Sequence, residues 1–237
     1  IVRIFTSSTF TDMLMERNTL MEYVYPKIRE YCREKHGLEF QVKIIPHLAS
    51  DKMTLKGKHN VLLGLLQFID IYVQVVDMRW GVRDEMTNEH MTTELCMTEL
   101  RNCQRLSMGP NFIYFGGQKY GYRPIPTEIV HSELIQLTEV LDTMGTDVSL
   151  LEKWYRVDMN AVPPVSILQP ITTHLTHFLN KRVPHLQARD SGIWWGTLPK
   201  MQMLLRKASH TLFINGKMTH EEMHNYHMAV TEREVIN

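Results

Sequence analysis

Three hydroxyl side chains follow the first predicted strand, where a helix is expected to begin. The segment Val2–Thr6 alternates apolar and polar residues, which predicts a strand. Ser7, Ser8 and Thr9 come directly after it. In a parallel sheet, the carboxyl ends of strands and the N-termini of helices form the usual ligand site. These hydroxyls are therefore candidates to hold a nucleotide phosphate or ribose, although plain N-capping of the next helix explains the same residues.

A second candidate group, Asp77, Arg79 and Trp80, follows another apolar and β-branched segment. If that segment is a neighbouring strand, these residues line the same crevice as the hydroxyls. Trp80 would then stack on a base, or it would simply anchor its loop. The glycine-containing segment 116–121 would let the backbone approach a phosphate, but a tight turn after a strand needs the same glycines.

One segment matches a zinc-peptidase pattern. The sequence His220-Glu221-Glu222-Met223-His224 has the HExxH spacing, and His227 adds a third imidazole one turn later. Thr219 and Glu222 also form a capping box, which predicts an ordinary helix start. We expect the capped helix and no metal site.

Composition excludes several classes of protein. Lys plus Arg and Asp plus Glu both number 26, so the formal net charge is zero, and no basic excess indicates a nucleic-acid partner. The apolar segment 61–76 is interrupted by polar residues and is too short for a membrane span. Three cysteines exclude a disulfide framework and suit a reducing compartment. We expect a cytoplasmic protein with no membrane span.

The elements that must position the candidate residues alternate between strand and helix. After the first strand, apolar spacing predicts a helix that is kinked or restarted at Pro26 and ends at Gly37, and then a strand over Leu38–Val42. A second helix begins near residue 83, the apolar segment Asn111–Phe115 resembles a buried central strand, and a third helix runs over 126–141. This order predicts an α/β fold with a doubly wound parallel sheet over residues 1–145. Residues 146–237 are predicted to be a helical extension, with one helix starting near Thr197 and Pro199.

The segment 42–74 reads as an insert. Phe40-Gln41-Val42 is echoed by Val73-Gln74-Val75, and deleting 42–74 would leave one uninterrupted strand. We predict that the second half, Phe68–Val76, takes a central position in the sheet and that Leu38–Ile45 lies at an edge. Sequence alone does not distinguish a genuine insert from a splice variant or a gene-model error.

Several short motifs occur in a characteristic order: Val2–Phe10, Asp12, Glu16-Arg17, Tyr25-Pro26-Lys27, Asp77-Met78-Arg79-Trp80-Gly81, Cys96–Leu100 and Gly116–Gly121. Over residues 1–145 this set resembles the TIR-like N-terminal domain of the NACHT and WD-repeat protein family. The end of the chain, 229–237, looks like the approach to that family's NTPase domain. No GxxxxGK[ST] phosphate loop is present, so we do not expect nucleotide hydrolysis here.

The resemblance implies two alternative functions. TIR domains are either self-associating scaffolds or enzymes that cleave NAD at the glycosidic bond. The matching position for the enzymes' glutamate is Glu133, which would stabilise an oxocarbenium-like transition state. Glu133 could equally be a solvated helix-face carboxylate, and Glu128 a first-turn acid favoured by the helix dipole.

We expect a non-enzymatic interaction and regulatory module of a signalling protein, which binds protein partners or self-associates through exposed, partly Met-rich helix faces. No cofactor is expected in that interpretation. The alternative is an NAD glycohydrolase that uses Glu133, with NAD as the bound nucleotide.

Overall fold

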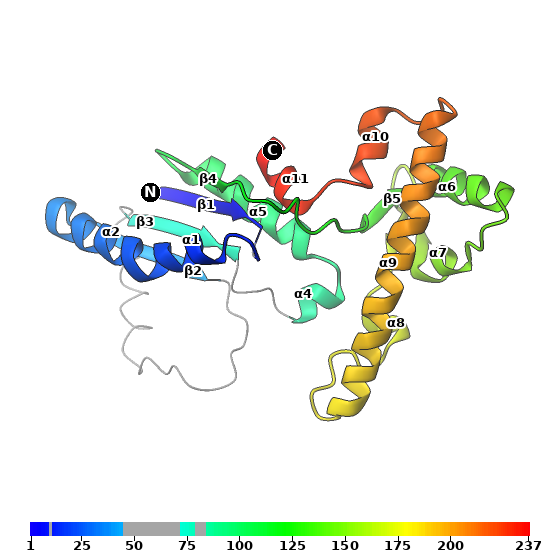
Figure 1. Ribbon diagram of the computed structural model, residues 1–237, viewed down its shortest axis with the longest axis horizontal. Coiled ribbons are helices and arrows are strands. Elements are labelled where there is room, and N and C mark those ends of the chain that lie inside the picture. The colour runs from blue at the N-terminus through cyan, green and yellow to red at the C-terminus, as the bar shows by residue number, and fades with distance from the viewer. Residues whose placement is uncertain (10, 45–71, 79–83) are drawn as a thin grey trace. The chain divides into compact units, whose positions relative to one another are not determined.

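The computed structural model describes residues 1–9, 11–44, 72–78 and 84–237, which form two compact units (Figure 1). The first unit takes its described residues from 1–83, 94–121 and 234–237. The second unit comprises 84–93 and 122–233. The domain boundary expected near residue 145 lies inside the second unit, so this division differs from the expected one.

The first unit is built on a parallel four-stranded sheet. Its strands are β1 (Val2–Ser8), β2 (Glu39–Ile44), β3 (Tyr72–Asp77) and β4 (Phe112–Phe115). They lie in the order β2-β3-β1-β4, and every neighbouring pair is parallel. The predicted α/β fold with a parallel sheet is confirmed.

The strand that ends the predicted insert lies inside this sheet. β3 pairs with β1 on one side, where Ile4 is opposite Val75, and with β2 on the other. β2 is an edge strand among the described strands. The predicted central position is therefore confirmed for Tyr72–Val76, while residues 45–71 of the segment lie outside the described residues.

The prediction of a buried central strand over Asn111–Phe115 is wrong. Among the described strands β4 lies at an edge of the sheet, and Ile113 and Tyr114 are exposed. An uninterrupted apolar run indicates a strand, but it does not distinguish a strand buried on both sides from an edge strand with exposed apolar side chains.

Helices cover both faces of the sheet (Figure 1). The helical segment before β2 comprises α1 (Leu14–Thr19), the π-helical turn η1 (Leu20–Val24), α2 (Tyr25–Tyr31) and the π-helical turn η2 (Cys32–His36). It packs Tyr25 and Cys32 against Phe40 and Val75. α5 (Thr92–Leu106) lies on the other face, where Glu99 pairs with Arg3 of β1 at 2.5 Å. The sheet therefore carries helices on both faces, as a doubly wound fold requires.

Two local predictions for the first helical segment are confirmed. Pro26 occupies the first turn of α2, directly after the π-helical turn, where its missing N–H costs least. Gly37 follows with φ of 64°, a left-handed conformation that ends the helix.

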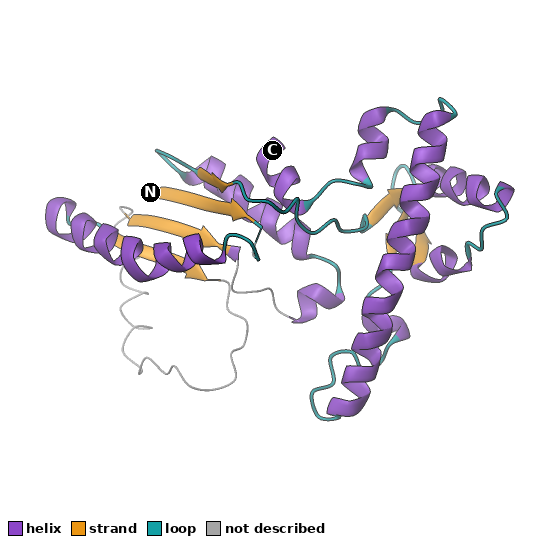
Figure 2. Ribbon diagram, viewed as in Figure 1, coloured by secondary structure: helices purple, strands orange, loops and turns teal. Residues whose placement is uncertain are grey.

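The second unit contains a small antiparallel sheet and several helices (Figure 2). Its strands are β5 (Glu128–Val130), β6 (Tyr155–Asp158) and β7 (Val165–Leu168), in the order β5-β7-β6. Its helices are α4 (Asp84–Asn88), α6 (His131–Thr143), α7 (Ser149–Trp154), α8 (Ile171–His174), α9 (Pro184–Ile214) and α10 (His220–Asn225); α11 (Val230–Ile236) runs from this unit into the first. The helices predicted for the extension 146–237 are present, and the segment also contains the antiparallel pair β6 and β7, which the sequence did not predict.

Helix α9 organises the core of the second unit. It runs unbroken for 31 residues through Pro199, so the predicted start near Thr197 is wrong. Its buried side chains, including Trp194 and Leu205, pack in one core cluster with Leu137 of α6 and Trp154 of α7. Burial of this long apolar stripe outweighs the hydrogen bond that Pro199 removes. Within the described residues, no helix combines the length and apolar character that crossing a bilayer requires.

Candidate functional site

A fully buried arginine lies at the carboxyl edge of the parallel sheet. Arg17 projects from α1, and its guanidinium donates from Nε to Ser8 Oγ at 2.6 Å and from Nη2 to the Thr6 carbonyl oxygen at 3.0 Å. Nη1 pairs with Asp77 Oδ1, a carboxylate that is itself buried. One cation therefore joins the ends of β1 and β3 in a site without solvent.

Two of the predicted ligand-binding residues belong to this network. Ser8 accepts from Arg17 and donates to the Thr9 carbonyl oxygen at 2.9 Å, and Asp77 is the partner of the guanidinium. The structure thus brings Ser8 and Asp77 together, as the sheet topology predicted. Arg79 and Trp80, the other members of the second candidate group, lie outside the described residues.

On the opposite face of β1, Ser7 meets a carboxylate from the last helix. Ser7 Oγ donates to Glu234 Oε2 at 2.6 Å, and both residues are buried. The Cys96 thiol of α5 also hydrogen-bonds to Glu234, and burial raises the pKa of Cys96 to about 12. Such a thiol stays protonated at neutral pH, so it acts as a hydrogen-bond donor and not as a nucleophile.

Thr9 connects the loop after β1 with the loop after β4. Its hydroxyl donates to Asp12 Oδ1, and Asp12 Oδ2 accepts from the backbone N–H of Lys119 at 2.7 Å. A Cβ on Gly117 would lie 2.3 Å from Asp12 Oδ2, so any other residue at this position would displace the Asp12 carboxylate. The segment 116–121 thus packs against the carboxylate of Asp12, whereas the sequence had suggested that its backbone could approach a bound phosphate.

The helix-capping explanation for the hydroxyls is wrong. β1 continues through Ser8, and α1 has Met13 at its N-cap position with no side-chain cap. The hydroxyls are instead buried hydrogen-bonding groups at the sheet edge.

The predicted catalytic residue Glu133 lies in the second unit. It occupies the first turn of α6, and its Oε1 accepts a hydrogen bond of 2.6 Å from the hydroxyl of Tyr226. Burial, followed by the hydrogen bond to Glu133, raises the pKa of Tyr226, so this phenol remains a proton donor. Glu128, which was expected to be an acid in a first helical turn, lies instead in strand β5.

The HExxH segment forms the predicted capped helix. Thr219 accepts from the Glu222 backbone N–H at 3.2 Å, and Glu222 accepts from the Thr219 backbone N–H at 2.7 Å, which completes the capping box. His224 Nε2 lies 3.1 Å from Glu232 Oε1. The described part of the chain holds no group of three or more metal-ligating side chains.

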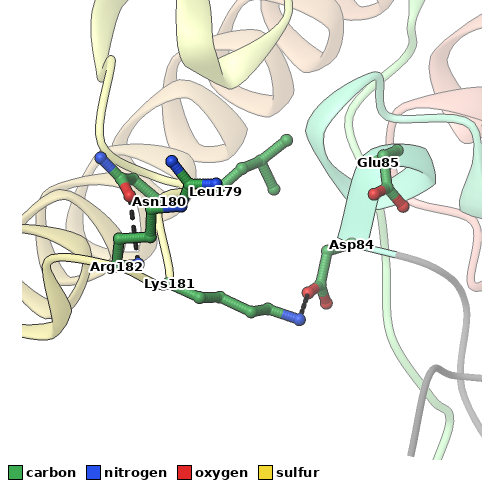
Figure 3. A pocket seen from close by; sticks show the side chains of 6 residues that line it. All are labelled: Asp84, Glu85, Leu179, Asn180, Lys181 and Arg182. Atoms are coloured by element: carbon green, nitrogen blue, oxygen red, sulfur yellow. Dashed lines mark hydrogen bonds and ion pairs between the residues drawn. The ribbon is translucent and has the colours of Figure 1, made fainter.

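A shallow pocket of about 450 Å³ lies in the second unit, between the start of α4 and the loop before α9 (Figure 3). Across it, Lys181 Nζ pairs with Asp84 Oδ2 at 2.5 Å, and the Lys181 side chain is largely exposed. The hydrogen bond to Asp84 and the charge of that carboxylate raise the pKa of Lys181. The charges of Lys181 and Asp84 therefore compensate each other. Because its pKa is raised, Lys181 stays protonated and is unsuited to act as a general base.

Sequence reasoning missed the residues at the centre of these networks, Arg17 and Glu234. Arg17 falls at helical spacing between the buried Met13 and Leu20, which packs on the core. A positively charged side chain on the apolar face of a helix needs a buried partner of opposite charge. The position of Arg17 in the sequence therefore already indicated a buried ion pair. Glu234 carries no such signal, because only the tertiary fold brings it to Ser7.

Glu234 makes stability depend on pH. Burial raises its pKa, against the opposing effects of Ser7, Arg17 and Cys96. A raised folded-state pKa means that stability is full below the ordinary value of 4.5 and is lost as pH rises through the folded value. We expect Glu234→Gln to remove this loss, so that urea unfolding of the variant varies less between acidic and neutral pH.

The control for this titration is Glu221→Gln, which changes an exposed carboxylate of α10. The pH dependence of its unfolding free energy should be the same as that of the parent. Glu234→Ala should instead cost about 1–3 kcal/mol at every pH, because it leaves the buried Ser7 hydroxyl without its acceptor. A Glu234→Gln profile that is parallel to that of the parent would contradict the assignment.

Comparisons with known proteins identify relatives for most of the chain. Human NACHT and WD repeat domain-containing protein 2 is 30% identical over 233 residues, which covers 98% of this chain and 12% of the relative. Mouse NACHT domain- and WD repeat-containing protein 1 is 30% identical over 155 residues, 65% of this chain and 8% of the relative. Mouse telomerase protein component 1 is 28% identical over 123 residues, 52% of this chain and 3% of the relative.

The chain therefore spans only a small part of the length of these relatives. No solved structure matches it significantly, so the TIR-like part of the resemblance stays a prediction. Residues 3–139 match the family described as a domain of unknown function, DUF4062. The chain belongs to the DUF4062 family, and NACHT and WD repeat domain-containing proteins are among its homologues.

Proposed function

We propose that this chain is a non-enzymatic interaction and regulatory module of a NACHT and WD repeat type protein in the cytoplasm. The observation that carries the proposal is the occupation of the sheet's carboxyl edge by Arg17 and its partners. An open α/β sheet binds its ligand at that edge. Here the guanidinium is fully buried and bonded to Ser8, Asp77 and the Thr6 carbonyl oxygen.

A ligand at this edge would have to displace protein hydrogen bonds that are already made. Ser7 is bonded to Glu234, and Thr9 to Asp12. Breaking a buried charged pair without replacing it costs about 3–5 kcal/mol, which a weakly bound nucleotide does not supply. These contacts favour a structural role for the edge.

Exposed apolar side chains support a role in protein contacts. The first unit exposes Tyr23 of η1, Tyr31 of α2 and Met108 after α5, in addition to the side chains of β4. Large apolar side chains on a surface are the common anchors of protein interfaces. The names of the homologues add that such chains occur in proteins with further domains.

The alternative, an NAD glycohydrolase that uses Glu133, makes a different prediction. We expect no nicotinamide release when the purified chain is incubated with NAD, at concentrations up to those at which it self-associates. The hydrogen bond to Tyr226 gives Glu133 a structural function that needs no substrate. Liquid chromatography of the products, alongside sedimentation of the same samples, checks this result.

Two variants separate catalysis from folding if nicotinamide does appear. Glu133→Ala removes the carboxylate, whereas Tyr226→Phe removes the same hydrogen bond and keeps the carboxylate. Release that is lost in Glu133→Ala but retained in Tyr226→Phe would establish the enzyme and refute the proposal.

A further inference from the structure

The outer side of β4 offers backbone hydrogen-bonding groups. The N–H of Phe5 donates to the Asn111 carbonyl oxygen at 2.8 Å, and the parallel register places Phe5 opposite Phe112. In a parallel ladder, residues 111, 113 and 115 then direct their backbone groups toward β1. The N–H and C=O groups of Phe112 and Tyr114 point the other way, where no described strand pairs with them.

This edge lacks the charged side chains that commonly protect edge strands against pairing. Edge strands generally carry charged side chains, whereas the segment 111–118 contains none. At the opposite edge of the sheet, β2 begins with Glu39. The side chains of Ile113 and Tyr114 are 42% and 51% exposed, so apolar surface accompanies the backbone groups.

The backbone geometry selects one register for pairing between two copies. In an antiparallel ladder, outward-pointing residues lie opposite each other and exchange two hydrogen bonds. Phe112 opposite Tyr114 of a second copy satisfies this rule with residues inside β4, and it places Ile113 on the two-fold axis. A shift of two residues brings in either Pro110, which has no N–H, or Gly116, which lies beyond the strand.

We propose that β4 is a self-association edge, at which two copies of this chain pair antiparallel with Phe112 opposite Tyr114. A second copy fits because the segment 111–118 carries no charged side chain, so two copies of this edge meet in the antiparallel register without like-charge repulsion. The pairing creates two Phe112–Tyr114 contacts on one face and an Ile113–Ile113 contact on the other. This inference rests on the proposed interaction function and names its site and partner.

Cysteine cross-linking tests the register in the whole chain. Ile113→Cys places two cysteines in a non-hydrogen-bonded pair, with Cα atoms about 4.5 Å apart, within the disulfide range. Tyr114→Cys alone places them roughly 9 Å apart, which is too far, and the same holds for Phe112→Cys. A mixture of Phe112→Cys and Tyr114→Cys should form the mixed dimer. The natural cysteines, Cys32, Cys96 and Cys103, are buried and do not interfere.

Under mild oxidation, Ile113→Cys should form covalent dimer at least ~10-fold faster than Met15→Cys, because pairing raises the effective thiol concentration. Met15 is 73% exposed on α1, so the cross-linking rate of Met15→Cys measures random collision between molecules. Circular dichroism verifies that each variant is folded. Equal rates at Met15, Ile113 and Tyr114 would overturn the inference.

The charge variant Ile113→Lys distinguishes this inference from the broader proposal. It places two cations on the axis and should lower self-association by at least ~10-fold in sedimentation, whereas Met15→Lys should not. Self-association that persists in Ile113→Lys, without cross-linking at residue 113, would refute the β4 pairing but leave the interaction function standing. A chain that stays monomeric throughout would refute the β4 pairing and remove self-association from the proposed function.

Discussion

Replacement of Arg17 by methionine should destabilise the first unit by about 3–5 kcal/mol. The methionine fills a similar volume, but it leaves the Asp77 carboxylate in a buried site without the guanidinium. The variant also removes the donors to Ser8 and to the Thr6 carbonyl oxygen. Urea unfolding followed by circular dichroism measures the loss.

The matched control is Arg101→Met, which breaks the exposed pair of Arg101 with Glu94 in the same unit. Exposed pairs contribute about 0–1 kcal/mol, so this variant should unfold close to the parent. Arg17→Met/Asp77→Asn should cost less than the sum of its two single variants, because the removed groups interact. An Arg17→Met variant within about 1 kcal/mol of the parent would show that the network does not hold the sheet edge together.

Replacement of Trp194 by alanine should cost the second unit about 3–5 kcal/mol. Trp194 is 2% exposed, and its ring lies 4.9 Å from that of Trp154, centroid to centroid. His90 packs against the same indole at 5.0 Å. Truncation opens a cavity that these rigid rings cannot fill. Thermal unfolding and near-ultraviolet circular dichroism, which is sensitive to the tryptophan pair, report the change.

The adjacent Trp195 supplies a control of identical chemistry. It is 52% exposed, since successive helical residues of α9 point in different directions. Trp195→Ala should therefore change stability by about 0.5 kcal/mol or less. Equal effects of the two substitutions would be incompatible with the burial of Trp194 and with an unbroken α9.

Local sequence signals succeeded where a few neighbouring residues determine the conformation. Gly37 ends its helix in the left-handed region, and Thr219 with Glu222 forms the predicted capping box. The same kind of pattern at Ser149 and Glu152 did not form a box, because Val148 occupies the N-cap and Asp147 accepts from the Ser149 N–H instead. Pro199 suggested a helix start, yet tertiary packing of α9 overrode it.

Strand patterns identified the strands of the sheet but not every position within it. The β-branched run ending at Asp77 was correctly placed inside the sheet, whereas the apolar run of β4 was not recognised as an edge. The short strands β5, β6 and β7 were missed, because three or four residues carry too little periodicity to distinguish them from loops.

By itself, the sequence determined the parallel α/β sheet, the adjacency of Ser8 and Asp77 at its carboxyl edge, and the uncharged character of β4. These features follow from residue periodicity and from the rule that parallel strands end together. Only the tertiary structure decided that Arg17 fills that edge, that Glu234 reaches Ser7, and that Glu133 bonds to Tyr226. Those contacts join residues distant in the chain, and the partner of a buried charge depends on which groups the fold brings within hydrogen-bonding distance.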